Sequence, residues 1–155
     1  MSTENIISVK RRRDNLLWVG TNKGPQSINL KTGAFNNYQY SPTDSNSISS
    51  NIVYLINEDR DGYIWIGTDN GLNRLDRKTE HFKKFLLNLP VINSYEDSGE
   101  SIWALSNIGL YKFDQKTDDF IPASNQYDIL NGLLVTPWIE EDHGQNLWLN
   151  TNKEL

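Results

Sequence analysis

The sequence predicts an all-β fold built from one repeated, four-stranded antiparallel unit. Tryptophan recurs in related contexts, the segments around it are short and rich in β-branched and aromatic residues, and clusters of Gly, Asn and Asp separate them. Self-similarity with a period of about 20–50 residues marks a repeat architecture. We therefore expect the units to fold alike and to pack on one another.

Four of the five tryptophans define the repeat. Their contexts are LLWVGTNKG, YIWIGTDNG, SIWALSNIG and NLWLNTNKE, around Trp18, Trp65, Trp103 and Trp148. In the first three units a phenylalanine follows its tryptophan by 17 residues, at Phe35, Phe82 and Phe120. We expect one domain over 1–155, with units at about 5–40, 51–86, 90–122 and 134–155, the last incomplete.

The second unit shows why each unit is expected to contain four strands. The segments Asn51–Asp59 (NIVYLINED) and Tyr63–Thr68 (YIWIGT) have the composition of strands, and Asp61-Gly62 between them favours a hairpin because glycine accepts positive φ. Further turns are expected at Asp69–Gly71 and at Lys78–Glu80. These three turns separate four antiparallel strands.

A four-stranded unit of about 40–45 residues has the size of a β-propeller blade. Neighbours cover both faces of a blade, so apolar residues on consecutive positions, such as Ile64, Trp65 and Ile66, are typical of its middle strands. We expect a partial β-propeller of about three and a half four-stranded antiparallel blades, with the four repeated tryptophans packed between blades. A β-sandwich is disfavoured because its strands usually alternate in polarity.

Composition excludes several classes of chemistry. The chain has 155 residues, 15 Lys plus Arg, 20 Asp plus Glu, a formal net charge of −5, two histidines and no cysteine. A thiolate nucleophile, a disulfide framework and a cysteine metal site are therefore excluded. We expect no metal site, no cofactor and no nucleic-acid partner. No apolar run reaches the roughly 18 residues of a membrane helix, so we expect no membrane contact by this segment.

Paired carboxylates recur with the repeat, at Glu58-Asp59, Glu96-Asp97 and Glu141-Asp142. Such pairs could serve glycoside hydrolysis, but adjacent residues of a strand point to opposite faces. We therefore expect a structural role for them at the strand end and hairpin. His81 and His143 are expected to face solvent, and the basic run 10–13 to form a solvated edge rather than an anion-binding patch.

The stretch INEDRDGYIWIGTDNGLNRLD (Ile56–Asp76), with the linker SPTDSNSISSNIV (Ser41–Val53), resembles the two-component regulator propeller repeat. That family forms the extracytoplasmic sensor of many bacterial histidine kinases, notably hybrid two-component systems that regulate polysaccharide use in gut Bacteroidetes. The other units depart from its pattern. Arg11-Arg12 replace the acidic pair in the first unit, and Leu105 and Asn150 replace the glycine after tryptophan in the third and fourth.

The resemblance implies a ligand-sensing propeller that is not an enzyme, with an oligosaccharide as its ligand. It places the complete protein in the periplasm and implies that a histidine kinase can accompany the sensor. Residues 1–14 lack the apolar stretch of a signal peptide, and closed propellers typically have about 4–8 blades. We therefore expect a fragment of a longer protein, whose open faces are covered by missing blades or by a second copy.

Ligand contacts are expected where the sequence departs from the repeat pattern. The segment Pro122–Gly132 is long and irregular, carries Tyr127, and is followed by Trp138, the one tryptophan outside the repeat. Aromatic rings near a channel mouth suit the apolar faces of sugars, although packing also explains Trp138. Two other classes remain open: a protein–protein interaction scaffold and, less favoured, a polysaccharide lyase or hydrolase on a propeller frame.

Overall fold

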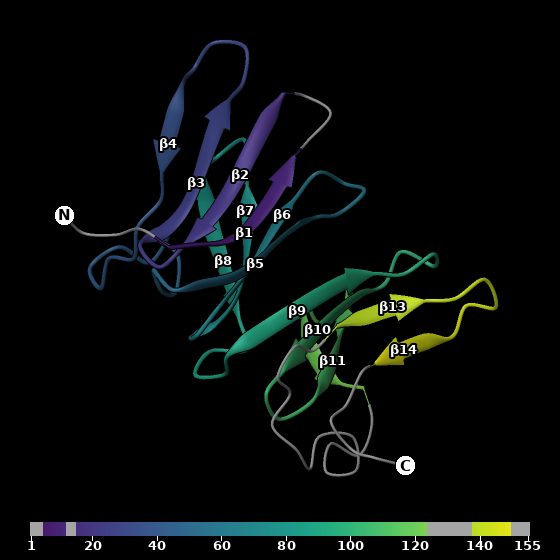
Figure 1. Cartoon of the computed structure of the whole chain (residues 1–155). Coiled ribbons are helices and arrows are strands. Elements are labelled where there is room, and N and C mark those ends of the chain that lie inside the picture. Colours follow the sequence, from purple (N-terminus) through teal and green to yellow (C-terminus); the bar gives the residue numbers. More distant parts are fainter. Residues whose placement is uncertain (1–4, 12–14, 124–137, 150–155) are drawn as a thin grey trace.

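The computed structural model describes residues 5–11, 15–123 and 138–149, in which every regular element is a strand (Figure 1). No helix in these described ranges is long and apolar enough to cross a membrane.

The strands form four sheets, called blades 1 to 4 in chain order. Blade 1 contains β1 (Ile6–Arg11), β2 (Leu16–Thr21), β3 (Gly24–Asn29) and β4 (Phe35–Asn37). Blade 2 contains β5 (Val53–Glu58), β6 (Ile64–Thr68), β7 (Gly71–Asp76) and β8 (His81–Phe85). Blade 3 contains β9 (Val91–Glu96), β10 (Ile102–Ser106), β11 (Leu110–Asp114) and β12 (Asp119–Pro122), and blade 4 contains β13 (Ile139–Glu141) and β14 (Leu147–Leu149).

Every blade is antiparallel, and its strands lie in chain order. The first strands β1, β5, β9 and β13 lie next to one another from blade to blade. Figure 1 shows the blades following one another from purple to yellow without closing into a ring. The predicted all-β partial propeller of about three and a half blades is therefore confirmed.

A hydroxyl side chain holds the turn between the second and third strands of three blades. In blade 2, Thr68 Oγ1 donates to the carbonyl of Gly71 over 3.0 Å and accepts from the amide of Asn70 over 3.1 Å. Gly71 has φ +114°, and a Cβ there would lie 2.6 Å from the carbonyl oxygen of Phe85, so glycine is required. Thr21 and Ser106 make the same contacts in blades 1 and 3.

Apolar clusters fill the space between successive blades. Ile64 and Ile66 belong to the cluster that blades 1 and 2 share, whereas Trp65 belongs to the cluster between blades 2 and 3. Their exposed fractions are 1%, 0% and 3%. The expectation that consecutive residues of a middle strand are buried on opposite faces is therefore confirmed.

The repeated tryptophans are not equally buried. Trp18 and Trp65 are 2% and 3% exposed, and Trp103 is partly buried against the cluster between blades 3 and 4. Trp148 is 58% exposed, so the prediction that it packs between blades is wrong for the described part of the chain. The reason is geometric: no further described sheet lies on the face of blade 4 to which Trp148 belongs.

The first hairpin forms although an acidic pair is missing from it. β1 and β2 pair from Ile6 opposite Thr21 to Arg11 opposite Leu17. The indole Nε1 of Trp18 is buried in this blade and has no hydrogen-bond partner. Backbone pairing therefore suffices to make the hairpin, although the indole of Trp18 lacks the hydrogen bond that the other repeated tryptophans make.

Candidate functional site

The aspartate of each acidic pair fastens its own hairpin. Asp59 Oδ2 accepts a hydrogen bond of 2.7 Å from Trp65 Nε1, and its Oδ1 accepts one of 2.8 Å from the amide of Tyr63. The indole contact recurs at 2.7 Å between Trp103 and Asp97 and at 2.8 Å between Trp148 and Asp142. These carboxylates therefore hold the tryptophan ring and the turn in one geometry.

In blades 3 and 4 the glutamate of the pair instead accepts hydrogen bonds from the first hairpin turn of the preceding blade. Glu96 Oε2 accepts a hydrogen bond of 3.0 Å from the amide of Arg60 in the hairpin turn of blade 2. Glu141 accepts bonds of 2.7 Å from both the amide and the hydroxyl of Ser98 in the turn of blade 3. The two members of a pair thus serve different contacts, which confirms their predicted structural role.

Hydrogen bonding and burial shift the pKa values of two of these carboxyl groups, Asp142 and Glu96, in opposite directions. The indole N–H of Trp148, together with the amide N–H of Asn146, lowers the pKa of Asp142 to about 2. Burial raises the pKa of Glu96, although the amide and side chain of Arg60 oppose that shift. Asp142 is therefore held ionised, whereas Glu96 is harder to ionise.

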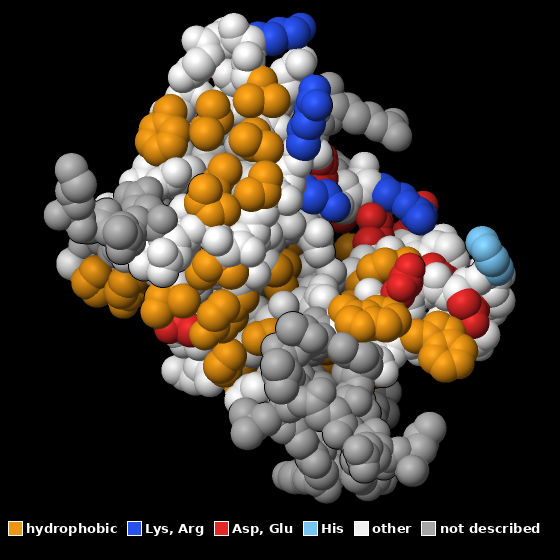
Figure 2. Space-filling model, in the orientation of Figure 1, with side chains coloured by type: hydrophobic (Ala, Val, Ile, Leu, Met, Phe, Trp, Pro, Cys, Tyr) orange, Lys and Arg blue, Asp and Glu red, His pale blue; other side chains and the backbone are white. Residues whose placement is uncertain are grey.

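A groove runs between blades 2 and 3 where the tips of their first hairpins meet. Its volume is about 610 Å³. The residues that decide its chemistry are Arg60, Tyr63, Arg74, Glu96, Glu100 and Asp118. Figure 2 shows basic and acidic side chains gathered in a hollow between two parts of the molecule. We call this feature the inter-blade groove.

Arg74 supports one side of the inter-blade groove. Its guanidinium carbon lies 4.8 Å from the ring centroid of Tyr63 and 5.6 Å from that of Trp65, which are cation–π distances. Its Nη2 lies 3.4 Å from Oδ1 of Asp118 in blade 3. Lys83 also pairs with Asp118, and the hydrogen bond from Lys83 lowers the pKa of that carboxyl group. Aromatic and ionic contacts across the two blades therefore fix the guanidinium.

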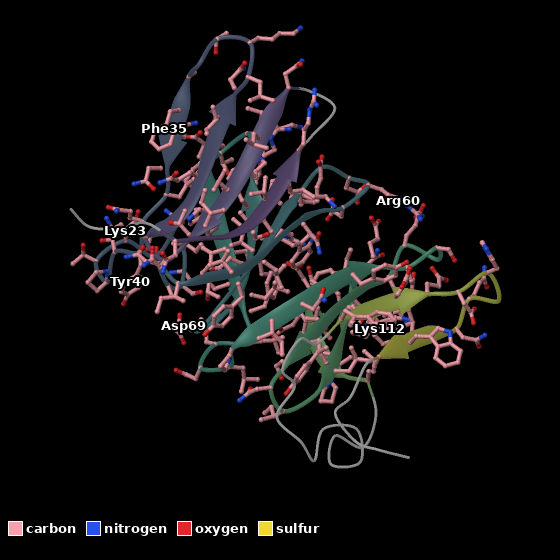
Figure 3. The ribbon with its side chains drawn as sticks, in the orientation of Figure 1. Lys23, Phe35, Tyr40, Arg60, Asp69 and Lys112 are labelled. Atoms are coloured by element: carbon pink, nitrogen blue, oxygen red, sulfur yellow. The ribbon has the colours of Figure 1, made fainter. Side chains whose placement is uncertain are left out.

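Arg60 crosses the groove near its mouth. In Figure 3 its side chain leaves the tip of the β5–β6 hairpin and points toward the tip of the β9–β10 hairpin. Its Nη1 lies 3.5 Å from Glu100 Oε1 and donates to the carbonyl of Ser98 over 3.3 Å. The side chains of Arg60 and Glu100 are 52% and 73% exposed, so this ion pair is open to solvent.

The predicted ligand residues lie elsewhere. Trp138 directly precedes β13, is 43% exposed, and lines a second cavity of about 350 Å³ together with Trp148 and His143. Tyr127 lies outside the described residues. His81 and His143 are exposed, as predicted. In the described part of the chain, no group of three or more His, Asp or Glu side chains is placed to hold a metal ion.

Sequence reasoning missed Tyr63 and Arg74 as lining residues. Tyr63 stands where the other units have Leu16, Ser101 and Asn146. That departure from the repeat was visible in the sequence. It lies in the first hairpin of blade 2, however, whereas the ligand contacts were predicted in and just after the irregular segment Pro122–Gly132.

Comparison with known proteins supports this fold. Residues 47–70 match the model of the family described as two component regulator propeller. No curated protein matches the sequence. The matched residues comprise the end of the linker before blade 2 and its first hairpin, β5–β6, where the repeat is most regular.

Solved structures resemble the chain over almost its whole length. The extracellular domain of the hybrid two component system BT3049 from B. thetaiotaomicron has a TM-score of 0.78 at 21% identity, with 99% of this chain and 22% of that chain covered. The corresponding domain of BT4673 from the same organism gives 0.75 at 19% identity, covering 94% and 19%. Virginiamycin B lyase from Staphylococcus aureus, with quinupristin, gives 0.73 at 16% identity, covering 96% and 50%. The chain therefore spans about a fifth of the first two structures, and at these identities the likeness establishes the fold.

Proposed function

We propose that this chain is part of the extracytoplasmic sensor of a two-component system. Its task is to bind an oligosaccharide without transforming it. The observation that carries the proposal is the match of residues 47–70 to that family, together with the likeness to two extracellular domains of hybrid two component systems. The same likeness supports a periplasmic location for the complete protein.

A sensor needs a ligand that binds one receptor arrangement more tightly than another, because only a difference in affinity shifts the equilibrium. Stacked blades suit this requirement since a ligand between two of them contacts both. The contacts between Glu96 and Arg60 and between Glu141 and Ser98 already join successive hairpins. A ligand near these hairpins would bias how the blades sit against each other.

The repeated carboxylates favour binding over catalysis. A glycoside hydrolase needs two carboxyl groups that face the same bond. Here Asp59 is engaged by the indole of Trp65, and Glu96 is engaged by the amide of Arg60 in the neighbouring blade. Each group is committed to holding the fold, which supports a role that is not enzymatic.

Trp138 and Tyr127 remain the ligand contacts expected from the sequence. The exposed indole of Trp138 and the cavity of about 350 Å³ beside it offer an apolar face for a sugar ring. His143 and Glu140 supply polar groups in the same cavity. This arrangement supports Trp138 as a binding residue of the sensor.

An interaction scaffold is the second candidate. Two apolar surfaces lie at opposite ends of the stack of blades: Trp148 on blade 4 is 58% exposed, and Ile6 and Val9 on blade 1 are 66% and 57% exposed. Exposed apolar patches commonly mark protein interfaces. Further blades or a second copy of the chain would cover these surfaces.

Calorimetric titration with a panel of oligosaccharides, followed by an assay for new reducing ends, tests the proposal. The sensor role predicts binding heat from at least one saccharide and no release of reducing ends. Heat from none of them would favour the scaffold. Reducing ends released from a polysaccharide would instead support a lyase or hydrolase.

A further inference from the structure

We infer that the inter-blade groove is a binding site for a neutral oligosaccharide, with Tyr63 as its stacking platform. This inference rests on the proposed sensor role and assigns its ligand class and a site separate from Trp138. The groove lies between the tips of the first hairpins of blades 2 and 3. Its volume of about 610 Å³ falls within the range of about 300–1,000 Å³ typical of small-molecule sites.

Tyr63 supplies the apolar contact. The residue is 36% exposed, and the guanidinium of Arg74 lies over its ring at 4.8 Å. Arg74 is itself held by Asp118 and by the ring of Trp65, so the tyrosine rests on a fixed support. A sugar has one apolar face of C–H groups that packs on an aromatic ring, and a ring that is already ordered loses little entropy on binding.

Polar groups around Tyr63 suit the hydroxyl groups of a sugar. Glu100 and Asp118 offer carboxylate acceptors whose side chains are 73% and 52% exposed, and Arg60 offers guanidinium donors with 52% exposure. Hydrogen bonds between a hydroxyl and a carboxylate are among the stronger ones in proteins. The groove therefore combines an aromatic platform with both donors and acceptors.

The charges of the groove favour a neutral ligand over an acidic one. Its carboxylates are Asp59, Asp61, Glu96, Glu100 and Asp118, and its guanidinium groups are those of Arg60 and Arg74. Both guanidinium groups already pair with carboxylates, Arg60 with Glu100 and Arg74 with Asp118. A uronate or sulfated sugar would meet an excess of negative charge, whereas uncharged hydroxyl groups would not.

The test compares Tyr63→Ala with Tyr54→Ala in the full chain. Tyr54 has the same 36% exposure but lies on β5, away from the lining of the groove. Calorimetry measures Kd for neutral cello-, xylo- and malto-oligosaccharides and for an acidic oligogalacturonate. Tyr63→Ala is expected to weaken neutral-sugar binding by about tenfold or more, and Tyr54→Ala by less than about twofold. Thermal unfolding of both variants verifies that each remains folded.

A second readout locates the ligand. The indole N–H of Trp65 lies at the groove through its bond to Asp59, so its NMR signal should shift on titration while that of Trp18 should not. Unchanged binding by Tyr63→Ala would overturn the assignment of this groove. If Trp138→Ala then abolished binding, the sensor role would stand with its ligand at the other cavity. Binding of the acidic oligosaccharide alone would contradict the neutral class, and no binding by the unmodified chain would contradict both proposals.

Discussion

Trp65 donates its indole hydrogen bond to Asp59, six residues earlier, over 2.7 Å. The same bond spans the same six residues in blades 3 and 4, at 2.7 Å and 2.8 Å. When a tryptophan ring packs against the next blade, its indole N–H needs a hydrogen-bond acceptor. The aspartate at the hairpin supplies that acceptor. The recurring Asp and Trp therefore form one hydrogen bond, which links the hairpin to the tryptophan ring that packs between blades.

Replacing Asp59 tests this contact. Asp59→Ala removes the acceptor for both Trp65 Nε1 and the amide of Tyr63, and should lower the free energy of unfolding by about 1–3 kcal/mol. Asp61→Ala, in the same turn, is the matched control and should change it by less than about 0.5 kcal/mol. Urea denaturation measures both. Equal effects would show that the indole bond contributes nothing specific.

The first unit offers the reverse experiment. Trp18 Nε1 is buried without a hydrogen-bond partner, and the sequence has Arg12 at the position six residues before it. Arg12→Asp should supply the missing acceptor and raise the free energy of unfolding by about 1–2 kcal/mol. Arg13→Asp changes the net charge by the same amount and should not raise the free energy of unfolding. A larger gain from Arg13→Asp would refute the explanation.

Gly67 marks a place where two blades approach closely. A Cβ there would lie 2.4 Å from the carbonyl oxygen of Val91 and 2.7 Å from Cδ2 of Leu55. Gly67→Ala should therefore destabilise the chain by about 1–3 kcal/mol through overpacking. At Gly99 an added Cβ would reach only the carboxylate of Asp97, at 3.3 Å, so Gly99→Ala should have a smaller effect. Thermal denaturation of the two variants distinguishes these cases.

The pKa of Asp142 predicts a pH dependence. Hydrogen bonds from Trp148 and Asn146 hold the folded pKa at about 2, below the ordinary value of 3.8. A group whose pKa is depressed by folding stabilises the fold above its ordinary pKa, and this contribution disappears as the pH falls toward 2. Trp148→Phe should move the pKa of Asp142 upward, as an NMR titration of its carboxyl carbon would show. Trp138→Phe should leave the pKa of Asp142 unchanged.

Local pattern was enough to predict the blades. Consecutive apolar residues at Ile64, Trp65 and Ile66 reveal a strand buried on both faces, and a hairpin at Asp61-Gly62 follows from the chemistry of the turn. The opposite pointing of Glu96 and Asp97 followed from strand geometry alone. These features depend on residues that are close in sequence.

Features that depend on the neighbouring blade escaped prediction. Arg74 meets Asp118, 44 residues later, only because blades 2 and 3 stack in one particular way. Trp148 has the same local sequence context as Trp65, yet its exposure differs because burial is decided by what lies opposite. The inter-blade groove is formed by such long-range contacts, so the sequence showed Tyr63 as a departure from the repeat but did not predict the groove itself.

Hydrogen exchange of the four repeated indole N–H groups, followed by NMR, tests the stacking of the blades most directly. The structure predicts slow exchange for Trp18 and Trp65, intermediate exchange for Trp103 and fast exchange for Trp148, in the order of their burial. Equal rates for all four, or fast exchange at Trp65, would contradict the packing of these rings between successive sheets.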